Sequence, residues 1–468
     1  MREIFDLNYN WYFNRENVDK HIFDYANVDD FETVNIPHNV VDIPLHYFDE
    51  RELQITSTYK KEIYIQKDWQ GKVINLIFEG VAHISHIFIG DTFVYTHHGG
   101  YDEFTVDISE FVIYGENNML TVVVDSHENV FVPPFGGRLD FLGYGGIYRE
   151  VKLEVLEQSH IEDLFIKTYN PVNDSTITID VELTVESGTL EACLFDGNIE
   201  VLKTKIIINN KHMVFRLDYN NKVLWSIYNP HLYYVEITLF DGDEPVDKIR
   251  ERFGFRTAKF TEEGFYLNEE IIKLRGLSRH QSYPYVGNAM PKSAQVEDAD
   301  ILKYKLGVNI VRCANYLPST HFLNRCDEIG LLVYVEIPGW NHIGSKEWQE
   351  VSLNNLKAMI KRDKNHPSVI LWGVRISGSE DNEEFYLKTN QLAHQLDDTR
   401  QTGGSRSIFN SKLLEDVYTF DDFTYKKKRY ISNKKKVAGN VSYLLTGHNG
   451  PLYPTKSYDN EKIVLEQG

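Results

Sequence analysis

Hydrophobic residues alternate with polar ones along short runs in the first third of the chain. The runs at 59–65, 73–78, 84–89 and 120–124 are rich in β-branched and aromatic residues, and glycine- or asparagine-containing stretches separate them. Short strands at this spacing, with no helical period between them, are typical of an antiparallel sandwich. We therefore predict a first β domain over residues 1–156.

The alternating pattern continues through the next part of the chain. Residues 176–183 and 234–240 again place apolar side chains at every second position. About 100 residues of this pattern fit one sandwich of immunoglobulin size. We predict a second β domain over residues 157–256.

The hydrophobic period changes after residue 257, where short apolar runs begin to alternate with stretches of helical period. Such β-α alternation predicts a parallel sheet, and this many units favour a barrel over 257–468. We identify seven strand candidates, the last at 441–445, whereas a complete (β/α)8 barrel takes ~250 residues and eight strands. The barrel is therefore predicted to lack its eighth strand. The first four strand candidates are 272–276, 309–312, 331–334 and 368–372, and the helices expected after them are 294–306, 322–329, 348–361 and 384–396.

Charge and cysteine content exclude several classes of protein. Lysine and arginine total 49 against 69 aspartates and glutamates, a net charge of −20, which argues against nucleic acid as a partner. No run approaches the ~18 apolar residues of a membrane span, and residues 1–6 lack the order of a secretion signal. The three cysteines are too scattered for a disulfide frame or a zinc knuckle. These features predict a cytoplasmic protein that binds neither membrane nor nucleic acid.

A series of short strings then occurs in a fixed order. In this order they resemble glycoside hydrolase family 2, the β-galactosidase and β-glucuronidase group, from about residue 30 onward. The resemblance implies a jelly-roll sugar-binding domain, an immunoglobulin-like domain and a TIM barrel, in agreement with the three predicted domains. The strings are GYGGIYR at 143–149, LWS at 224–226, NPHLY at 229–233, RFGFR at 252–256, LRG at 274–276, RH at 279–280, EIPGW at 336–340 and HPSVILWG at 366–373.

The resemblance also implies a chemistry that this chain lacks the side chains to perform. Retaining glycosidases use two carboxyl groups ~5–5.5 Å apart, one as nucleophile and the other as acid and base. The family places the acid/base glutamate in an Asn-Glu pair after the fourth barrel strand, and this pair is matched here by Ser377 and Gly378. The nucleophilic glutamate after the seventh strand is matched by Gly447. We therefore predict that hydrolysis is impaired or lost.

Other positions depart from the family or offer weak substitutes. Ser278 stands where the family has asparagine, and Asn315 where it has a site histidine. Glu380 lies two residues beyond Gly378 and would share its face if the strand continued, although a solvated loop acid is the simpler interpretation. Glu336, at the end of the third strand, either faces the site or is buried against an arginine.

Several residues are candidates for sugar binding. Asp140 matches an acid that reaches from the family's jelly roll into the barrel mouth, or it caps backbone amides. Trp340 offers an aromatic face for stacking, or it belongs to the core. Arg279 and His280 line the pocket or only support the first strand. The full substrate-binding set is Asp140, Arg279, His280, Asn315, Glu336, Trp340, Ser377 and His448.

No cofactor is expected from these residues. The family often uses Mg²⁺ or Na⁺ near the site, but the sequence offers no convincing ligand set, and His83 and His86 are spaced to face opposite sides of a strand. Residues 426–436 contain the one basic run, which is expected to be a solvated helix or loop.

The leading hypothesis is a β-galactosidase-like protein that binds β-linked sugars but hydrolyses them poorly or not at all. The alternatives are an active retaining glycosidase with displaced acids, an inactive barrel kept as an assembly scaffold, and a shortened or altered version of an active parent. The two free edges of a seven-stranded barrel would favour a homo-oligomer.

Overall fold

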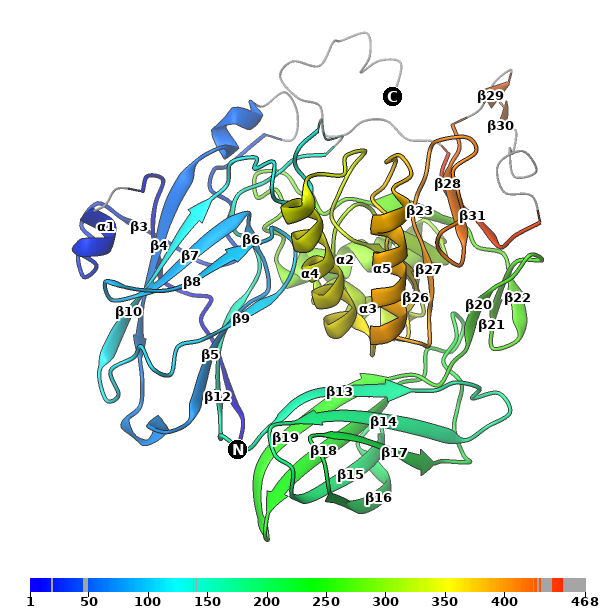
Figure 1. Ribbon diagram of the computed structural model, residues 1–468, viewed down its shortest axis with the longest axis horizontal. Coiled ribbons are helices and arrows are strands. Elements are labelled where there is room, and N and C mark those ends of the chain that lie inside the picture. Colours follow the sequence, from blue (N-terminus) through cyan, green and yellow to red (C-terminus); the bar gives the residue numbers. More distant parts are fainter. Residues whose placement is uncertain are drawn as a thin grey trace.

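The structure is a computed structural model that describes residues 1–17, 20–44, 49–137, 139, 141–423, 425–426, 429–430 and 440–448. Three domains follow one another along the chain, coloured blue to cyan, green, and yellow to orange in Figure 1. The first domain lies against the helices of the third, and the second lies below both (Figure 1).

The first domain is a sandwich of two antiparallel sheets with the orders β1-β12-β5-β9 and β3-β2-β4-β10-β7-β8. Strand β5 shows why these residues pair in this way, because Ile74, Leu76 and Phe78 are fully buried while their neighbours are not. The strands are β1 Glu3–Asp6, β2 Trp11–Asn14, β3 Glu32–Val34, β4 Thr56–Tyr64, β5 Val73–Phe78, β6 Val81–Ala82, β7 Ile84–Ile89, β8 Thr92–His98, β9 Phe104–Asp107, β10 Asn117–Asp125, β11 Gly146–Ile147 and β12 Val151–Leu156, with one short helix α1 Lys20–Phe23.

The second domain is an immunoglobulin-like sandwich with the sheet orders β13-β14-β17 and β16-β15-β18-β19. Its core contains apolar side chains from both sheets, including Ile177, Ile179, Leu190 and Val235. The strands are β13 Ile161–Lys167, β14 Thr176–Leu183, β15 Gly188–Asp196, β16 Ile199–Ile208, β17 His212–Asp218, β18 Tyr233–Asp241 and β19 Glu244–Phe253.

A small antiparallel sheet leads into the barrel and corrects one sequence expectation. The sheet consists of β20 Ala258–Phe260, β21 Phe265–Leu267 and β22 Glu270–Ile272. The first barrel strand, predicted at 272–276, instead begins at Gly276, because Ile272 ends the antiparallel sheet. Gly276 is needed there, since a Cβ at that position would lie 2.0 Å from the Ile310 carbonyl oxygen.

The barrel domain is built from parallel strands with helices outside. Within the described residues, five strands form the sheet β23-β24-β25-β26-β27, and β28 pairs with β31 in a second sheet. An isolated Arg406–Phe420 bridge connects the segment after β27 to β28, but β31 is not hydrogen-bonded to β23 as a strand, so the described barrel is not closed. The elements are β23 Gly276–Arg279, α2 Lys292–Asp300 continued by a π-helical turn Ile301–Lys305, β24 Ile310–Cys313, α3 Thr320–Ile329, β25 Leu332–Glu336, α4 Lys346–Asp363, β26 Val369–Gly373, α5 Glu383–Leu396, β27 Gln401–Gly403, β28 Tyr418–Asp421, β29 Tyr425–Lys426, β30 Arg429–Tyr430 and β31 Tyr443–Gly447.

Direct contacts join the first domain to the barrel. The Arg149 guanidinium donates to the Leu317 carbonyl at 2.5 Å, and the Trp348 indole N–H donates to the Phe135 carbonyl at 3.0 Å. Tyr101 stacks on Tyr316 with ring centroids 4.6 Å apart. These buried contacts fix the first domain beside the barrel mouth.

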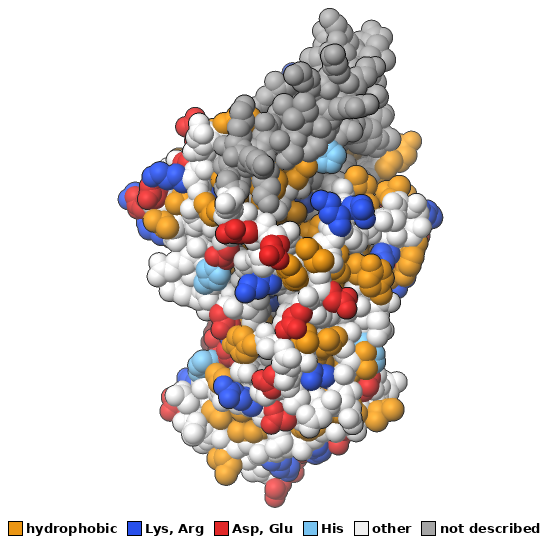
Figure 2. Space-filling model, turned by 90° about the vertical axis from the view of Figure 1, so that its right-hand side faces the viewer, with side chains coloured by type: hydrophobic (Ala, Val, Ile, Leu, Met, Phe, Trp, Pro, Cys, Tyr) orange, Lys and Arg blue, Asp and Glu red, His pale blue; other side chains and the backbone are white. Residues whose placement is uncertain are grey.

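The surface and the cysteines bear on the sequence expectations as well. Acidic, basic and hydrophobic side chains are interspersed over the face shown in Figure 2. Cys193, Cys313 and Cys326 are buried and free. Among the described helices, none combines the length and the apolar character that crossing a membrane would require.

Candidate functional site

A buried arginine organises the carboxyl ends of the parallel strands. Arg312 comes from β24, and its Nε donates to Glu336 Oε2 at 2.9 Å. Its Nη1 lies 3.2 Å from Asp421 Oδ1, and its Nη2 donates to Ser377 Oγ at 2.9 Å and to Asn315 Oδ1 at 3.3 Å. We call these five residues the Arg312 cluster. It links the ends of strands β24, β25 and β28 and the loop after β26.

Glu336 is held from all sides within this cluster. The side chain is 1% exposed, Ser405 Oγ donates to its Oε1 at 3.0 Å, and the Asn315 backbone N–H approaches its Oε2 at 3.4 Å. Burial lowers the pKa of the Arg312 guanidinium, but Asp421 and Glu336 outweigh this and raise that pKa above its ordinary value. Of the two interpretations of Glu336, the structure adopts the glutamate buried against an arginine.

Gly378 lies in a turn, whereas the sequence argument for Glu380 required a continuing strand. Strand β26 ends at Gly373, and the Ser379 N–H bonds to the Ile376 carbonyl at 3.2 Å. Gly378 has φ +70°, a left-handed conformation that favours glycine. Glu380 and Gly378 therefore do not share a face, because the turn directs Glu380 to the surface, where its side chain is exposed. Of the two interpretations of Glu380, the solvated loop acid is the one that the structure adopts.

The space beside Gly378 is already filled. A Cβ on Gly378 would lie 2.1 Å from the amide end of Asn341. That amide donates to the Gly378 carbonyl at 3.1 Å and accepts from Trp340 Nε1 at 2.9 Å in the orientation that satisfies both of its ends. Asn341 therefore occupies the position where a side chain at 378 would begin.

Gly447 has an equivalent neighbour on the other side of the mouth. A Cβ on Gly447 would lie 2.8 Å from Asp421 Oδ1, and this oxygen also accepts from Thr446 Oγ1 at 2.7 Å. His448, the next residue, is exposed. The Asp421 carboxylate thus lies beside the position where a side chain at 447 would begin.

Sequence reasoning missed Asp421 and Asn341. Asp421 ends the apolar run 417–420, the same strand-end position that singled out Glu336, so its signal was present in the sequence. Asn341 carried no such signal, because its role depends on the positive φ of Gly378, which lies 37 positions further along the chain.

Aromatic rings from two domains line one side of the mouth. His280 stacks on Phe141 of the first domain at 5.5 Å and lies 5.8 Å from the Tyr316 ring. Trp340 is partly buried and packs against the hydrophobic cluster that contains Phe141 and Tyr316. Burial, Arg312 and Arg279 together lower the pKa of His280 to about 4, so its ring is neutral at pH 7, and its buried Nδ1 has no hydrogen-bond partner among the described residues. Asp140 lies outside the described residues.

Arg279 is placed away from the Arg312 cluster. Its Nε donates to Asp298 at 2.8 Å and its Nη2 to Gln295 at 2.8 Å, both on α2, and its guanidinium lies 4.3 Å from the Phe322 ring centroid. Alternate residues of a strand point to opposite sides, so Arg279 faces the outer helices while its neighbour His280 turns toward the mouth. The structure thus gives Arg279 the supporting position.

Asn315 joins the site through its backbone as well as its amide. It has φ +70°, which asparagine tolerates better than most residues, and it is 2% exposed.

In the described part of the chain, no group of three or more His, Cys, Asp or Glu side chains is arranged to hold a metal ion.

Comparisons with known proteins cover all three domains. The family model described as the glycosyl hydrolases family 2 sugar binding domain matches residues 10–157, the model of glycosyl hydrolases family 2 matches 159–256, and its TIM barrel domain matches 258–436. A β-galactosidase from Thermoanaerobacterium thermosulfurigenes is 43% identical to this chain. The match includes 100% of this chain and 67% of the length of that protein. A β-galactosidase from Thermoanaerobacter pseudethanolicus is 39% identical over 98% of this chain and 62% of its own length. The crystal structure of an FMN-binding β-glucuronidase from Facaelibacterium prausnitzii L2-6 superposes with a TM-score of 0.80 at 26% identity, over 90% of this chain and 67% of that chain. The chain thus spans about two thirds of the length of these relatives.

Proposed function

Because the chain belongs to glycosyl hydrolase family 2, we propose that it is a β-galactosidase-like protein that binds β-linked sugars and in which hydrolysis is impaired or lost. The two sequence relatives named above, which are 43% and 39% identical, are β-galactosidases, which supports a β-galactoside as the sugar class. The observation that carries the proposal is the state of positions 378 and 447, where the backbone lacks a carboxylate and another side chain occupies the adjoining space.

The reaction itself explains why this state matters. Double displacement needs one carboxylate to attack the anomeric carbon and a second carboxyl group to protonate the leaving oxygen. The buried carboxylates of the Arg312 cluster, Glu336 and Asp421, both bind the same guanidinium. Neither is free to reach a glycosidic oxygen without breaking a buried ion pair, which is strongly unfavourable.

Sugar binding makes smaller demands on the site. The partly buried rings of His280 and Trp340, supported from behind by the buried Phe141 and Tyr316, provide apolar faces against which the C–H face of a sugar can pack. The Nδ1 of the neutral His280 imidazole is buried and has no partner among the described residues, so a sugar hydroxyl that reached it would complete its hydrogen bonding.

The test separates binding from turnover. We expect a non-hydrolysable β-thiogalactoside to raise the melting temperature of the native protein, through ligand linkage, without turnover of a chromogenic β-galactoside or β-glucuronide above the buffer rate. His280→Ala should abolish the stabilisation, and Tyr228→Ala, which removes a ring that is 85% exposed, serves as the matched control.

Turnover that Asp421→Asn abolishes, or a covalent sugar adduct on any side chain, would overturn the proposal. Glu380→Gln tests the displaced-acid alternative, since activity lost in that variant would assign catalysis to Glu380. The cytoplasmic location stays a prediction, and fractionation of the source cells would test it.

A second candidate function is assembly. The outer edge of β23 is unpaired within the described sheets, and Leu277 on that strand is 48% exposed. An unpaired parallel edge favours association with another chain. Light scattering over a concentration series should then show a mass that rises with concentration in the native protein and less in Leu277→Lys.

A further inference from the structure

A small cavity lies where the immunoglobulin-like domain meets the base of the barrel. Its volume is about 20 Å³, and its lining includes Gly254, Arg256, Lys364, Asn365, Thr399 and Arg400. A cavity needs roughly 10–15 Å³ by this measure to hold one water molecule. The pocket, which is partly open to solvent, therefore has room for a single water or a monatomic ion at its inner end.

The charges around this cavity do not balance. Lys364 forms an ion pair with Asp163 at 2.5 Å, and Arg400 forms one with Asp397 at 2.7 Å. Arg256 forms no ion pair with any residue that the structure describes, so its positive charge has no direct counterpart. No acidic side chain lines the cavity.

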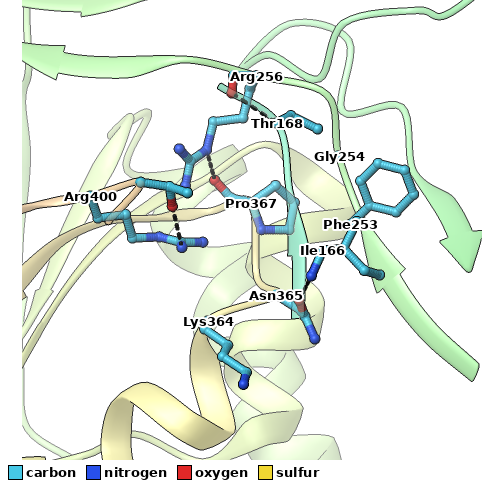
Figure 3. A pocket seen from close by; sticks show the side chains of 10 residues that line it. Ile166, Thr168, Phe253, Gly254, Arg256, Lys364, Asn365, Pro367 and Arg400 are labelled. Carbon is cyan, nitrogen blue, oxygen red and sulfur yellow. Dashed lines mark hydrogen bonds between the residues drawn. The ribbon is translucent and has the colours of Figure 1, made fainter. Parts of the chain in front are cut away.

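Backbone carbonyls satisfy only part of Arg256. Its Nε donates to the Pro367 oxygen at 2.9 Å and its Nη2 to the Val369 oxygen at 2.7 Å. Figure 3 shows the Arg256 and Arg400 side chains converging beside Pro367, with the Lys364 ammonium pointing away from them. Carbonyl dipoles accept hydrogen bonds but carry no net charge, and the two carboxylates that act on Arg256 from a distance, Asp397 and Asp327, form their ion pairs with other side chains.

Burial makes the missing counter-charge significant. Arg256 is 6% exposed, and burial together with the charge of Arg400 lowers the pKa of its guanidinium to about 9. A buried ion without a partner is strongly unfavourable, and a bound counter-ion removes that penalty.

We propose that this cavity binds a small inorganic anion of halide size, chloride in the cell, against the Arg256 guanidinium. A chloride ion is only slightly larger than water, and unlike water it supplies the negative charge that the site lacks. The ion would join the second domain, which carries Arg256, to the barrel segment 364–369 and to Arg400. This inference is independent of any sugar chemistry at the barrel mouth.

Crystallography with bromide in place of chloride tests the proposal directly. We expect an anomalous bromide peak in the cavity of the native protein, within hydrogen-bonding distance of Arg256, and no peak in Arg256→Gln. Ordinary water density without anomalous signal would overturn the proposal. A bromide peak that persists in Arg256→Gln would overturn the role of Arg256.

Thermal unfolding gives a second measurement. At fixed ionic strength, sodium chloride should raise the melting temperature above that in sodium gluconate, by on the order of 2 °C when the anion well exceeds its Kd. The same shift is expected in Arg216→Gln, which removes an exposed arginine of the same domain, but not in Arg256→Gln. Equal melting temperatures in the two salts would overturn the proposal, and this comparison and the bromide crystal need only the native chain if Arg256→Gln does not fold.

Discussion

Adding a single methyl group at Gly378 tests how closely Asn341 fills the space beside this residue. Gly378 has φ +70°, and its new Cβ would lie 2.1 Å from the Asn341 amide. We expect Gly378→Ala to destabilise the barrel domain for two separable reasons. The first is the left-handed backbone, and the second is the displacement of Asn341.

The magnitude follows from the two contributions. An L-residue in the left-handed region costs roughly 1–2 kcal/mol, and the reduced freedom of the unfolded chain returns about 0.4–1 kcal/mol. Moving Asn341 breaks its hydrogen bonds to the Gly378 carbonyl and from Trp340, each worth about 1 kcal/mol. We expect a net loss of about 2–3 kcal/mol in the free energy of unfolding.

A matched glycine isolates the second contribution. Gly307 has φ +68° in the same domain, and a Cβ there would meet nothing within 4 Å. Gly307→Ala should therefore lose only about 1 kcal/mol. Urea unfolding followed by tryptophan fluorescence measures both, since Trp348 and Trp372 are fully buried in the barrel domain. Equal losses in the two variants would refute the contact with Asn341.

The same contact affects a variant that places carboxylates at positions 378 and 447. Replacing Ser377 by asparagine and both glycines by glutamate would place a carboxylate at 378 against Asn341 and one at 447 against Asp421. We expect no activity from this variant, because adding Asn341→Gly, which also accommodates its own φ of +55°, would be needed to clear position 378, and Asp421 would still crowd position 447. Hydrolysis of a chromogenic β-galactoside without that addition would contradict the interpretation.

The remaining predictions concern the charged and titrating groups of the site. Arg312→Met leaves Glu336 and Asp421 buried without a cation, so the free energy of unfolding should fall by about 3–5 kcal/mol at pH 7, and a native-like value in urea titrations would contradict the cluster. The pKa of His280 is about 4 in the folded protein and 6.5 ordinarily, so its stabilising contribution is complete above pH 6.5 and is lost as the pH falls toward 4, by on the order of 3 kcal/mol. His280→Gln should remove that part of the pH dependence, and an unchanged stability profile would show that the ring is not buried neutral. Glu380→Gln should change stability by less than about 0.5 kcal/mol, because the side chain is exposed, and a larger change would reveal an unseen contact.

The periodicity of the sequence predicted the architecture because it reflects local burial. The helices expected at 322–329 and 348–361 lie within α3 and α4, and the strand at 331–334 overlaps β25. The first barrel strand was misplaced because Ile271, Ile272 and Leu274 are apolar for a different reason. They belong to or adjoin a small antiparallel sheet, and periodicity does not distinguish one apolar surface from another.

For the site, as for the fold, the sequence predicted the positions of residues along the strands but not their contacts. The resemblance predicted the positions of the strand ends, and with them Ser377, Gly378 and Gly447. It did not predict which side chains fill the space beside the two glycines. Asn341 and Asp421 are brought there by a turn and a parallel register that depend on contacts distant in sequence. Arg279 was ambiguous because a strand's two faces cannot be assigned until its neighbours are placed.

The contacts of Arg149 and Trp348 across the domain boundary have a consequence for dissecting this protein. Each places a buried polar hydrogen on a carbonyl of the other domain, so cutting the chain near residue 157 would strand both donors as well as the stacked faces of Tyr101 and Tyr316. Neither half then reproduces its structure in the intact chain, since each would expose to water an apolar surface with unpaired hydrogen-bond donors. The first 156 residues would therefore stabilise the barrel domain whether or not the chain hydrolyses sugar.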